Sequence, residues 1–181
     1  MSCESAKASA ARGTVSDRVL LDSIIDVSAR RLVLGTEVAA TKFLTGQRID
    51  DQVREQEILE SAAGKLRHAG HRYAFGMEFF SDQIEANKVI QRGLHRYWDE
   101  HPKEILGGHR HLTAELRLQL DIFNSQMLQA LVRLENIPPV GRSHIDGLFD
   151  RKLRTSATLR KLPTLRRDAA EIALRSLYGA R

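Results

Sequence analysis

Apolar residues recur at steps of three and four along most of this chain, which is the period of an amphipathic α-helix. The stripe of the first stretch runs through Leu20, Ile24, Val27, Leu34 and Val38. No segment alternates as a β-strand does. The fold class we expect is all-α, a helical bundle of about six helices. Four principal helices and a weaker C-terminal helical region are predicted over residues 15–45, 50–69, 71–100, 112–136 and 142–177.

Residues that end helices separate these stretches. Gly46, Gly70, Pro102 and Pro138 fall between successive periodic segments. The connections that they leave are short, as in helical bundles.

The chain has 181 residues, a length that suits one domain with a sizeable core. We expect a flexible Ser- and Ala-rich leader over residues 1–14 and a single all-helical domain over 15–181. Within that domain the catalytic helices are expected over 15–136 and a C-terminal helical extension over 137–181. The leader has no apolar core of a secretory signal, so the chain is expected to be cytoplasmic or trimmed after export. The single cysteine, Cys3, excludes an intrachain disulfide and a cysteine metal cluster.

Composition narrows the class of partner. Hydrophobic residues make up 42% of the chain and charged residues 28%, as in globular proteins. No apolar run approaches the roughly 20 residues that span a bilayer, so no membrane partner is expected. A formal charge of +5 and a pI near 9.7 favour acidic partners, either polymers or small anions.

Two cations interrupt the apolar stripe of the first helix. Arg31 and Lys42 are eleven residues apart, about three turns, so they share one face. A buried cation is costly without a partner, so an anionic group is expected to meet them.

The other principal helices also carry polar residues on their apolar faces. Asn87 and Gln91 interrupt the third helix, four residues apart, and Arg117 lies on the fourth. Arg54 lies on the second helix, and Asp51 near its start can cap the helix or contact a ligand. Singly, such residues are as well explained as side chains that snorkel to water or as satisfied core amides. Together they favour a site for a small dianion, because cations of one sign in a core need compensation.

Four segments carry a family resemblance. Residues 80–88, FSDQIEANK, are similar to the stretch FxDQIEANK of the all-helical (AroQ-type) chorismate mutases of the secreted, gamma subclass. The segments 31–43, 49–56 and 120–124 resemble the RL…VAxxKW, IEDxxREQ and LDxLN elements of that family. The order and the spacings are kept over residues 20–135, whereas 137–181 match only in length and helical character.

The resemblance implies a role for each polar residue. Arg31, Arg54 and Arg117 would bind the two carboxylates of chorismate, which suits the forked guanidinium group. Lys42 and Gln91 would donate hydrogen bonds to the ether oxygen. The implied catalytic residues are Lys42, Gln91, Arg31 and Arg54.

Two further residues are implied to bind substrate. Asp51 would contact the hydroxyl of chorismate. Asn87 would assist a carboxylate or the ring, at a position where Ser or Thr is commoner in the family.

The implied reaction is the Claisen rearrangement of chorismate to prephenate in phenylalanine and tyrosine biosynthesis. It needs no nucleophile, general base, cofactor or metal. The enzyme would hold the compact conformer of the substrate and stabilise its developing charge. The subclass also implies a homodimer, with each site built within one chain, in the periplasm or secreted.

Other functions stay open. Isochorismate-pyruvate lyase uses a similar set of residues on a related bundle. The basic stretch 151–167 could mark a non-catalytic helical module that binds nucleic acid, but it has no aromatic residue or docking motif, so no nucleic-acid partner is expected. His95, His101, His109 and His111 form no HxxxH pair, so no metal is expected.

Overall fold

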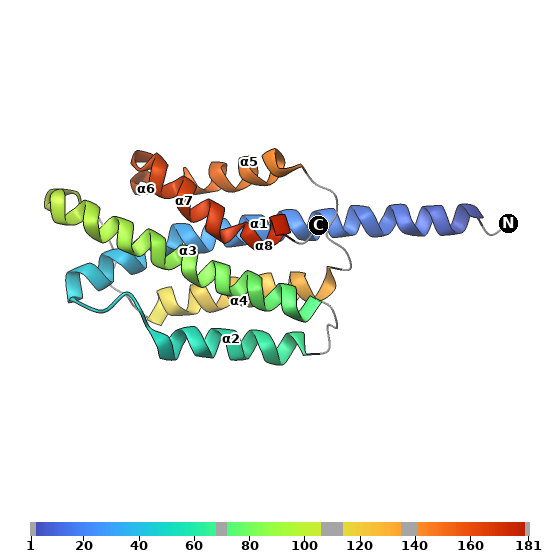
Figure 1. The fold of residues 1–181 in the computed structure, drawn as a ribbon, viewed down its shortest axis with the longest axis horizontal. Helices are drawn as coiled ribbons and strands as arrows, with labels where there is room; N and C mark the ends of the chain where they lie inside the picture. The colour runs from blue at the N-terminus through green and yellow to red at the C-terminus, as the bar shows by residue number, and fades with distance from the viewer. Residues whose placement is uncertain (1–2, 68–71, 106–113, 135–140, 180–181) are drawn as a thin grey trace.

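The structure is a computed structural model, and it describes residues 3–67, 72–105, 114–134 and 141–179. Residues 3–16 and 72 are described by their backbone alone. The described residues contain helices and no strand, so the predicted all-α class is confirmed. The elements, labelled in Figure 1, are α1 (Cys3–Thr45), α2 (Gln52–Leu66), α3 (Arg72–Glu100), a 3₁₀ turn (Pro102–Glu104), α4 (Ala114–Arg133), α5 (Arg142–Leu153), α6 (Ala157–Lys161), α7 (Pro163–Ala173) and α8 (Arg175–Gly179).

The helix boundaries differ from the prediction at both ends of the chain. The backbone of α1 is already helical at Cys3, because the Ala-rich run that follows has high helix propensity and no proline. At the C-terminal end, the predicted helical region over 142–177 contains four described helices, the last of which ends at Gly179. Ser156 caps α6, and Pro163 opens α7 because proline cannot continue a helix that precedes it.

The long helices α1 and α3 pack against each other at the centre of the bundle. Figure 1 shows α2 and α4 on one side of this pair and α5, α6 and α7 on the other. Among the described helices, none combines the length and the apolarity that crossing a membrane requires.

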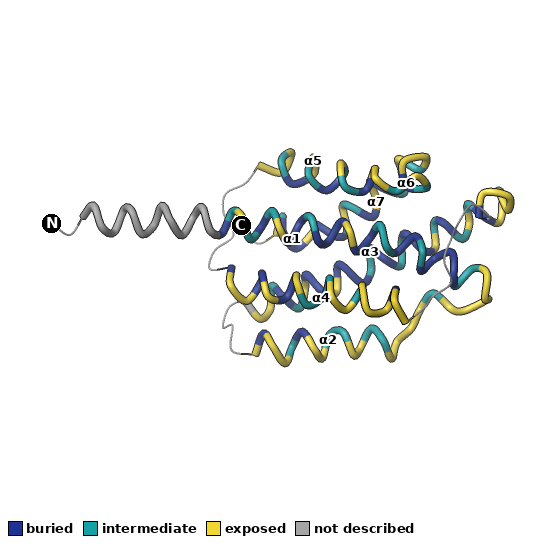
Figure 2. Tube along the Cα trace, turned by 180° about the vertical axis from the view of Figure 1, so that it is seen from behind, coloured by how far each residue is buried: buried dark blue, intermediate teal, exposed yellow. Residues whose placement is uncertain are grey.

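Apolar side chains from every principal helix share one core. Figure 2 shows the buried positions following the inner sides of α1 and α3. On the predicted stripe of α1, Ile24, Val27 and Val38 are buried, while Leu20 and Leu34 are half-buried. Burial of such side chains is the main favourable contribution to folding, at about 25 cal/mol per Å².

The C-terminal helices are joined to α3 by the Asp-Gln pair of the FSDQIEANK segment. The buried Asp82 carboxylate accepts the backbone N–H of Ser176 at 2.9 Å and pairs with Arg175. Gln83 donates to the carbonyl of Ala173 at 2.8 Å. These two residues therefore stabilise the fold, whereas Asn87 and Gln91 lie further along the same helix.

Candidate active site

All seven residues singled out in the sequence line one cavity of about 250 Å³. The cavity lies among α1, α2, α3 and α4, and its volume is close to the lower limit for small-molecule sites. Residues that lie up to 86 positions apart in the chain thus meet in one place: Arg31, Lys42, Asp51, Arg54, Asn87, Gln91 and Arg117.

Arg31 lies deepest among the cations, with only 5% of its surface exposed. Its Nε donates to Asn124 Oδ1 at 2.9 Å, and its Nη1 donates to the carbonyl of Gln83 at 2.9 Å. Burial, together with the nearby Arg54 guanidinium, lowers the pKa of Arg31 to about 10. A guanidinium has five N–H donors, so this fixed side chain has donors left for an anionic ligand.

Lys42 is half-buried near the C-terminal end of α1. Its Nζ donates to the carbonyl of Ile49 at 2.7 Å, in the connection that leads into α2. Burial lowers its pKa, and the Asp51 and Glu55 carboxylates partly oppose that shift. An ammonium group held in this way is a charged donor with two further N–H groups.

Arg54 on α2 bridges two helices. Its Nη1 donates to Glu57 on the same helix at 2.9 Å, and its Nη2 pairs with Asp121 on α4. The hydrogen bond to Glu57 is the largest influence that raises its pKa. Arg117 is an exposed residue on α4 that lines the same cavity. The two arginines enter the site from different helices.

Asn87 and Gln91 form a hydrogen-bonded pair one turn apart on α3. Gln91 Nε2 donates to Asn87 Oδ1 at 2.6 Å, and the exposed fractions are 5% for Gln91 and 7% for Asn87. Gln91 Oε1 is buried, and no described residue hydrogen-bonds to it. The pair supplies uncharged polar groups to a cavity whose lining also includes Gln47 and Asn124 but consists mostly of ions and apolar side chains.

Asp51 is the N-cap of α2. Its side chain accepts the backbone N–H of Arg54 at 3.1 Å, so the predicted capping role is observed. Its contact with a ligand stays a prediction, although the residue also lines the cavity.

Two variants separate these roles of Asp51. Asn caps a helix as well as Asp does, whereas Ala costs about 1 kcal/mol of stability. We therefore expect Asp51→Ala to lower the free energy of unfolding by about 1 kcal/mol and Asp51→Asn to leave it nearly unchanged, as measured by urea denaturation. A ligand role adds a rise in KM for Asp51→Ala, because alanine has no acceptor for a substrate hydroxyl. An unchanged KM in Asp51→Ala would exclude that role.

The charges around the cavity favour a dianion. Among the described residues that line it, five are cationic (Arg31, Lys42, Arg54, Lys88 and Arg117) and three carry carboxylates (Asp51, Glu55 and Glu57), a net charge of +2. Apolar side chains complete the wall, namely Val38, Ile49, Val53, Ile58, Ile84 and Leu120. Such a lining suits a compact ring that carries two carboxylates.

Sequence reasoning missed two residues of this site. Asn124 holds the Arg31 side chain, and it follows Arg117 by seven residues, two helical turns on the same face. Lys88 pairs with Glu55 at 3.1 Å across α2 and α3. Asn124 ends the LDIFN segment at 120–124, so its spacing from Arg117 was the signal that could have identified it.

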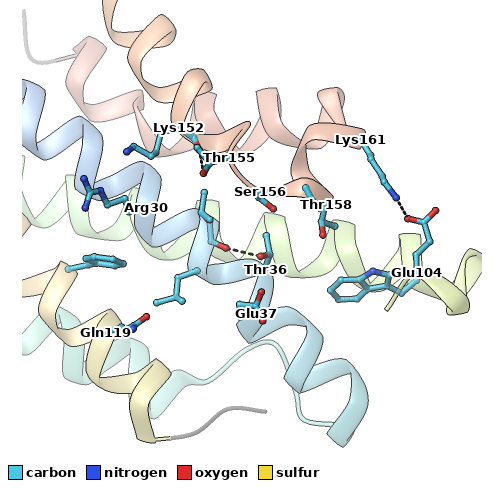
Figure 3. A pocket seen from close by; sticks show the side chains of 15 residues that line it. Arg30, Thr36, Glu37, Glu104, Gln119, Lys152, Thr155, Ser156, Thr158 and Lys161 are labelled. Atoms are coloured by element: carbon cyan, nitrogen blue, oxygen red, sulfur yellow. Dashed lines mark hydrogen bonds and ion pairs between the residues drawn. The ribbon is translucent and has the colours of Figure 1, made fainter. Parts of the chain in front are cut away.

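A larger cavity of about 680 Å³ lies along another face of α1, where residues of the C-terminal segment 152–161 help to line it (Figure 3). Among the described residues that line it, each cation already pairs with a carboxylate. Arg30 and Lys152 both pair with Asp26, at 2.7 and 2.9 Å, and Lys161 pairs with Glu104 at 2.6 Å. Because carboxylates of the protein already pair with its cations, the charges of this cavity do not favour an anionic ligand.

Four of the seven cations in the basic stretch 151–167 form ion pairs with carboxylates. Arg154 and Arg166 both pair with Asp150 at 2.6 Å, and Arg166 is buried. With the Lys152 and Lys161 ion pairs, several of its cations stabilise the packing of the C-terminal helices.

Two of the four histidines named in the sequence as possible metal ligands, His95 and His101, make other contacts. His95 Nε2 contacts the carbonyl oxygen of Ala39 at 2.9 Å, and the His101 ring stacks on Tyr97. His109 and His111 lie outside the described residues. No group of three potential metal-binding side chains occurs in the described part of the chain.

Comparison with known proteins gives one family of relatives. No protein-family model matches the chain. A protein described as the secreted chorismate mutase of Mycolicibacterium smegmatis is 28% identical over 165 residues, which cover 90% of this chain and 88% of that protein.

Two crystal structures agree with this likeness. The chorismate mutase from Burkholderia phymatum superposes with a TM-score of 0.68 at 25% identity, covering 89% of this chain and 97% of that one. The chorismate mutase from Burkholderia thailandensis gives a TM-score of 0.65 at 27% identity, covering 87% and 98% respectively.

Proposed function

We propose that this chain, an all-helical chorismate mutase of the secreted subclass in sequence and fold, rearranges chorismate to prephenate in the cavity among α1, α2, α3 and α4. The observation that carries the proposal is the convergence of seven polar residues from four helices on one cavity with a net charge of +2. Chorismate is a small ring with two carboxylates, so its charge and its shape complement that lining.

The arginines bind and orient the substrate in this proposal. Arg31, held by Asn124 and Gln83, receives one carboxylate through its remaining N–H groups. Arg54 and Arg117 enter from α2 and α4 and receive the other. Bidentate guanidinium contacts fix the direction of a carboxylate as well as its position, which holds the substrate in the conformer that reacts.

Lys42 and Gln91 act on the ether oxygen. As the carbon–oxygen bond breaks and the new carbon–carbon bond forms within one molecule, negative charge grows on that oxygen. A charged donor from α1 and an amide donor from α3 stabilise this charge more strongly than water does, because the helices fix both groups in advance. No proton has to be transferred and no covalent bond to the enzyme forms.

We expect catalysis to weaken at high pH, because Lys42 and Arg31 lose their positive charge there. Burial lowers the pKa of Lys42 below its ordinary 10.5, and the pKa of Arg31 to about 10. Raising the pH therefore neutralises these groups earlier than in water, so kcat/KM is expected to fall as the pH approaches 10. The bound dianion favours the charged forms, so kcat should decline only at a higher pH. Measuring kcat and kcat/KM from pH 6 to about 10.5 checks this expectation. If both fall at the same pH, the expectation is contradicted.

Isochorismate-pyruvate lyase activity is the nearest rival. Incubating the purified chain separately with chorismate and isochorismate, and analysing the products by chromatography, separates the two functions. We expect prephenate from chorismate and no enzymatic release of pyruvate from isochorismate. Pyruvate as the dominant product would replace the proposal with the lyase.

The cellular location that we propose rests on one relative. The relative from Mycolicibacterium smegmatis is named as secreted, so we place this enzyme in the periplasm or outside the cell, where prephenate would supply phenylalanine and tyrosine formation.

We also propose a homodimer, with residues 15–181 as one domain and each site within one chain. Light scattering tests the dimer, and a monomer at assay concentrations would exclude it.

A further inference from the structure

A glycine of α1 lies against α3 beside the candidate site. Arg31 donates to the carbonyl of Gln83, and one turn later Gly35 faces Asn87. A further turn on, the carbonyl of Ala39 meets His95. Positions 31, 35 and 39 therefore form the edge of α1 that packs on α3, with Gly35 in the middle.

Gly35 is required for space rather than for backbone conformation. Among the described residues, only Gly46 has a positive φ, so an alanine could adopt the backbone of Gly35. A Cβ at Gly35, however, would lie 2.6 Å from Asn87 Nδ2 and 3.2 Å from Asn87 Cγ. These distances are shorter than van der Waals contact, so the Asn87 side chain keeps its place only against a glycine.

Asn87 in turn decides which end of the Gln91 amide faces it. Asn87 Oδ1 accepts from Gln91 Nε2 at 2.6 Å. A Gln91 amide turned by 180° would set its own oxygen against that acceptor, which is unfavourable. The Gln91 nitrogen carries two N–H groups, and the contact with Asn87 uses one of them. The second remains available to a ligand in the cavity that Gln91 lines.

We propose that Gly35 is a positioning residue, which seats Asn87 so that Asn87 holds the Gln91 amide with an N–H directed to the substrate. The kinetic consequence rests on the proposed function, because it assumes that Gln91 donates to the ether oxygen. The geometric part does not rest on the proposed function, because it concerns only the contacts among Gly35, Asn87 and Gln91. It also gives Asn87 a role that the Ser or Thr commoner at its position in the family would not fill in the same way.

The first test is Gly35→Ala with Gly64→Ala as its matched control. Both glycines lie inside helices, but a Cβ at Gly64 meets nothing within 4 Å. We expect Gly35→Ala to lower kcat at least about tenfold, with a smaller change in KM and a helical circular-dichroism spectrum like that of the wild type. Gly64→Ala should keep the wild-type kcat. Equal kcat values for Gly35→Ala and the wild type would overturn the proposal.

A double-mutant cycle separates positioning from general disturbance of the helix pair. Asn87→Ser removes the group with which a Cβ at Gly35 collides, so Gly35→Ala should have no further effect on kcat in the Asn87→Ser background. A loss of the same size in both backgrounds would mean that Gly35 acts through packing alone, and the proposal would fail.

A measurement on the protein without substrate keeps this inference separate from the proposed function. In ¹H–¹⁵N spectra the side-chain amide signals of Gln91 should shift in Gly35→Ala and in Asn87→Ser but not in Gly64→Ala. If chorismate is not converted by the wild type, these shifts still test the positioning. Should Gly35→Ala not fold, the Asn87→Ser spectrum decides, and unmoved Gln91 signals there would refute the proposal.

Discussion

Replacing Lys42 with alanine is expected to lower kcat/KM for chorismate by about 10³-fold or more. Loss of one neutral donor to a developing oxyanion typically costs about 10²- to 10³-fold in rate, and Lys42 adds a full charge in a partly buried position. The Nζ group is fixed by the carbonyl of Ile49, so water that enters in its place does not restore the geometry. Steady-state kinetics measures the effect, and circular dichroism verifies that the helices persist.

Lys65→Ala is the matched control for this experiment. Lys65 lies in the last turn of α2, is exposed and does not line the cavity among α1, α2, α3 and α4. Its loss should leave kcat/KM within about twofold, because a distant surface charge is screened by salt. A Lys42→Ala enzyme within about tenfold of the wild type would remove Lys42 from the mechanism.

Replacing Arg54 with alanine is the second change with a very large expected effect, also about 10³-fold in kcat/KM. The substitution removes the guanidinium group proposed to bind a carboxylate of the substrate. It also leaves Glu57 and Asp121 without the cation that they contact. Those two carboxylates then repel a dianionic substrate. We expect KM to rise strongly along with the loss of kcat, which separates Arg54→Ala from Lys42→Ala.

Arg54→Lys distinguishes geometry from charge. A lysine keeps the positive charge but cannot make the bidentate contact, so it should recover only part of the lost activity. Arg154→Ala, which removes an exposed arginine paired with Asp150 on α5, is the control and should leave kcat/KM unchanged. Full activity in Arg54→Lys would show that charge alone suffices at this position.

The helices and their order could be predicted because the apolar period and the breaking residues act locally. The observed bounds of α2, α3 and α4 lie within a few residues of those predicted. The start of α1 could not be predicted in the same way, because a Ser- and Ala-rich segment has no apolar stripe to signal a helix. The short helices α6 and α8 have five residues each, too few for a periodic pattern to be recognised.

The residues of the site could be predicted for a different reason. A charged side chain on an apolar stripe is costly unless something compensates it, so the hydrophobic pattern alone singles out Arg31 and Lys42. The same pattern placed further polar residues on apolar faces, Arg117 among them, although Arg117 is exposed in the structure. The family resemblance, confirmed by the relatives and the fold, then implied a role for each of these residues. The roles of these residues stay predictions until variants are measured.

Partnerships across the bundle could not be derived from sequence. The bridge from Arg54 to Asp121 joins residues 67 positions apart, and Asn124 reaches Arg31 across 93 positions. A single amino-acid sequence does not indicate which of several carboxylates or amides a given cation contacts. Close approaches such as that of Gly35 to Asn87 depend on how two helices cross, which local patterns do not determine.

The proposed function is tested most directly by incubating chorismate with the purified wild-type protein in a buffer that contains a metal chelator. The loss of chorismate absorbance measures the rate, and chromatography identifies the product. If the proposed function is right, prephenate forms at a saturable rate far above that of the uncatalysed reaction. Chorismate that disappears no faster than in buffer alone would contradict it.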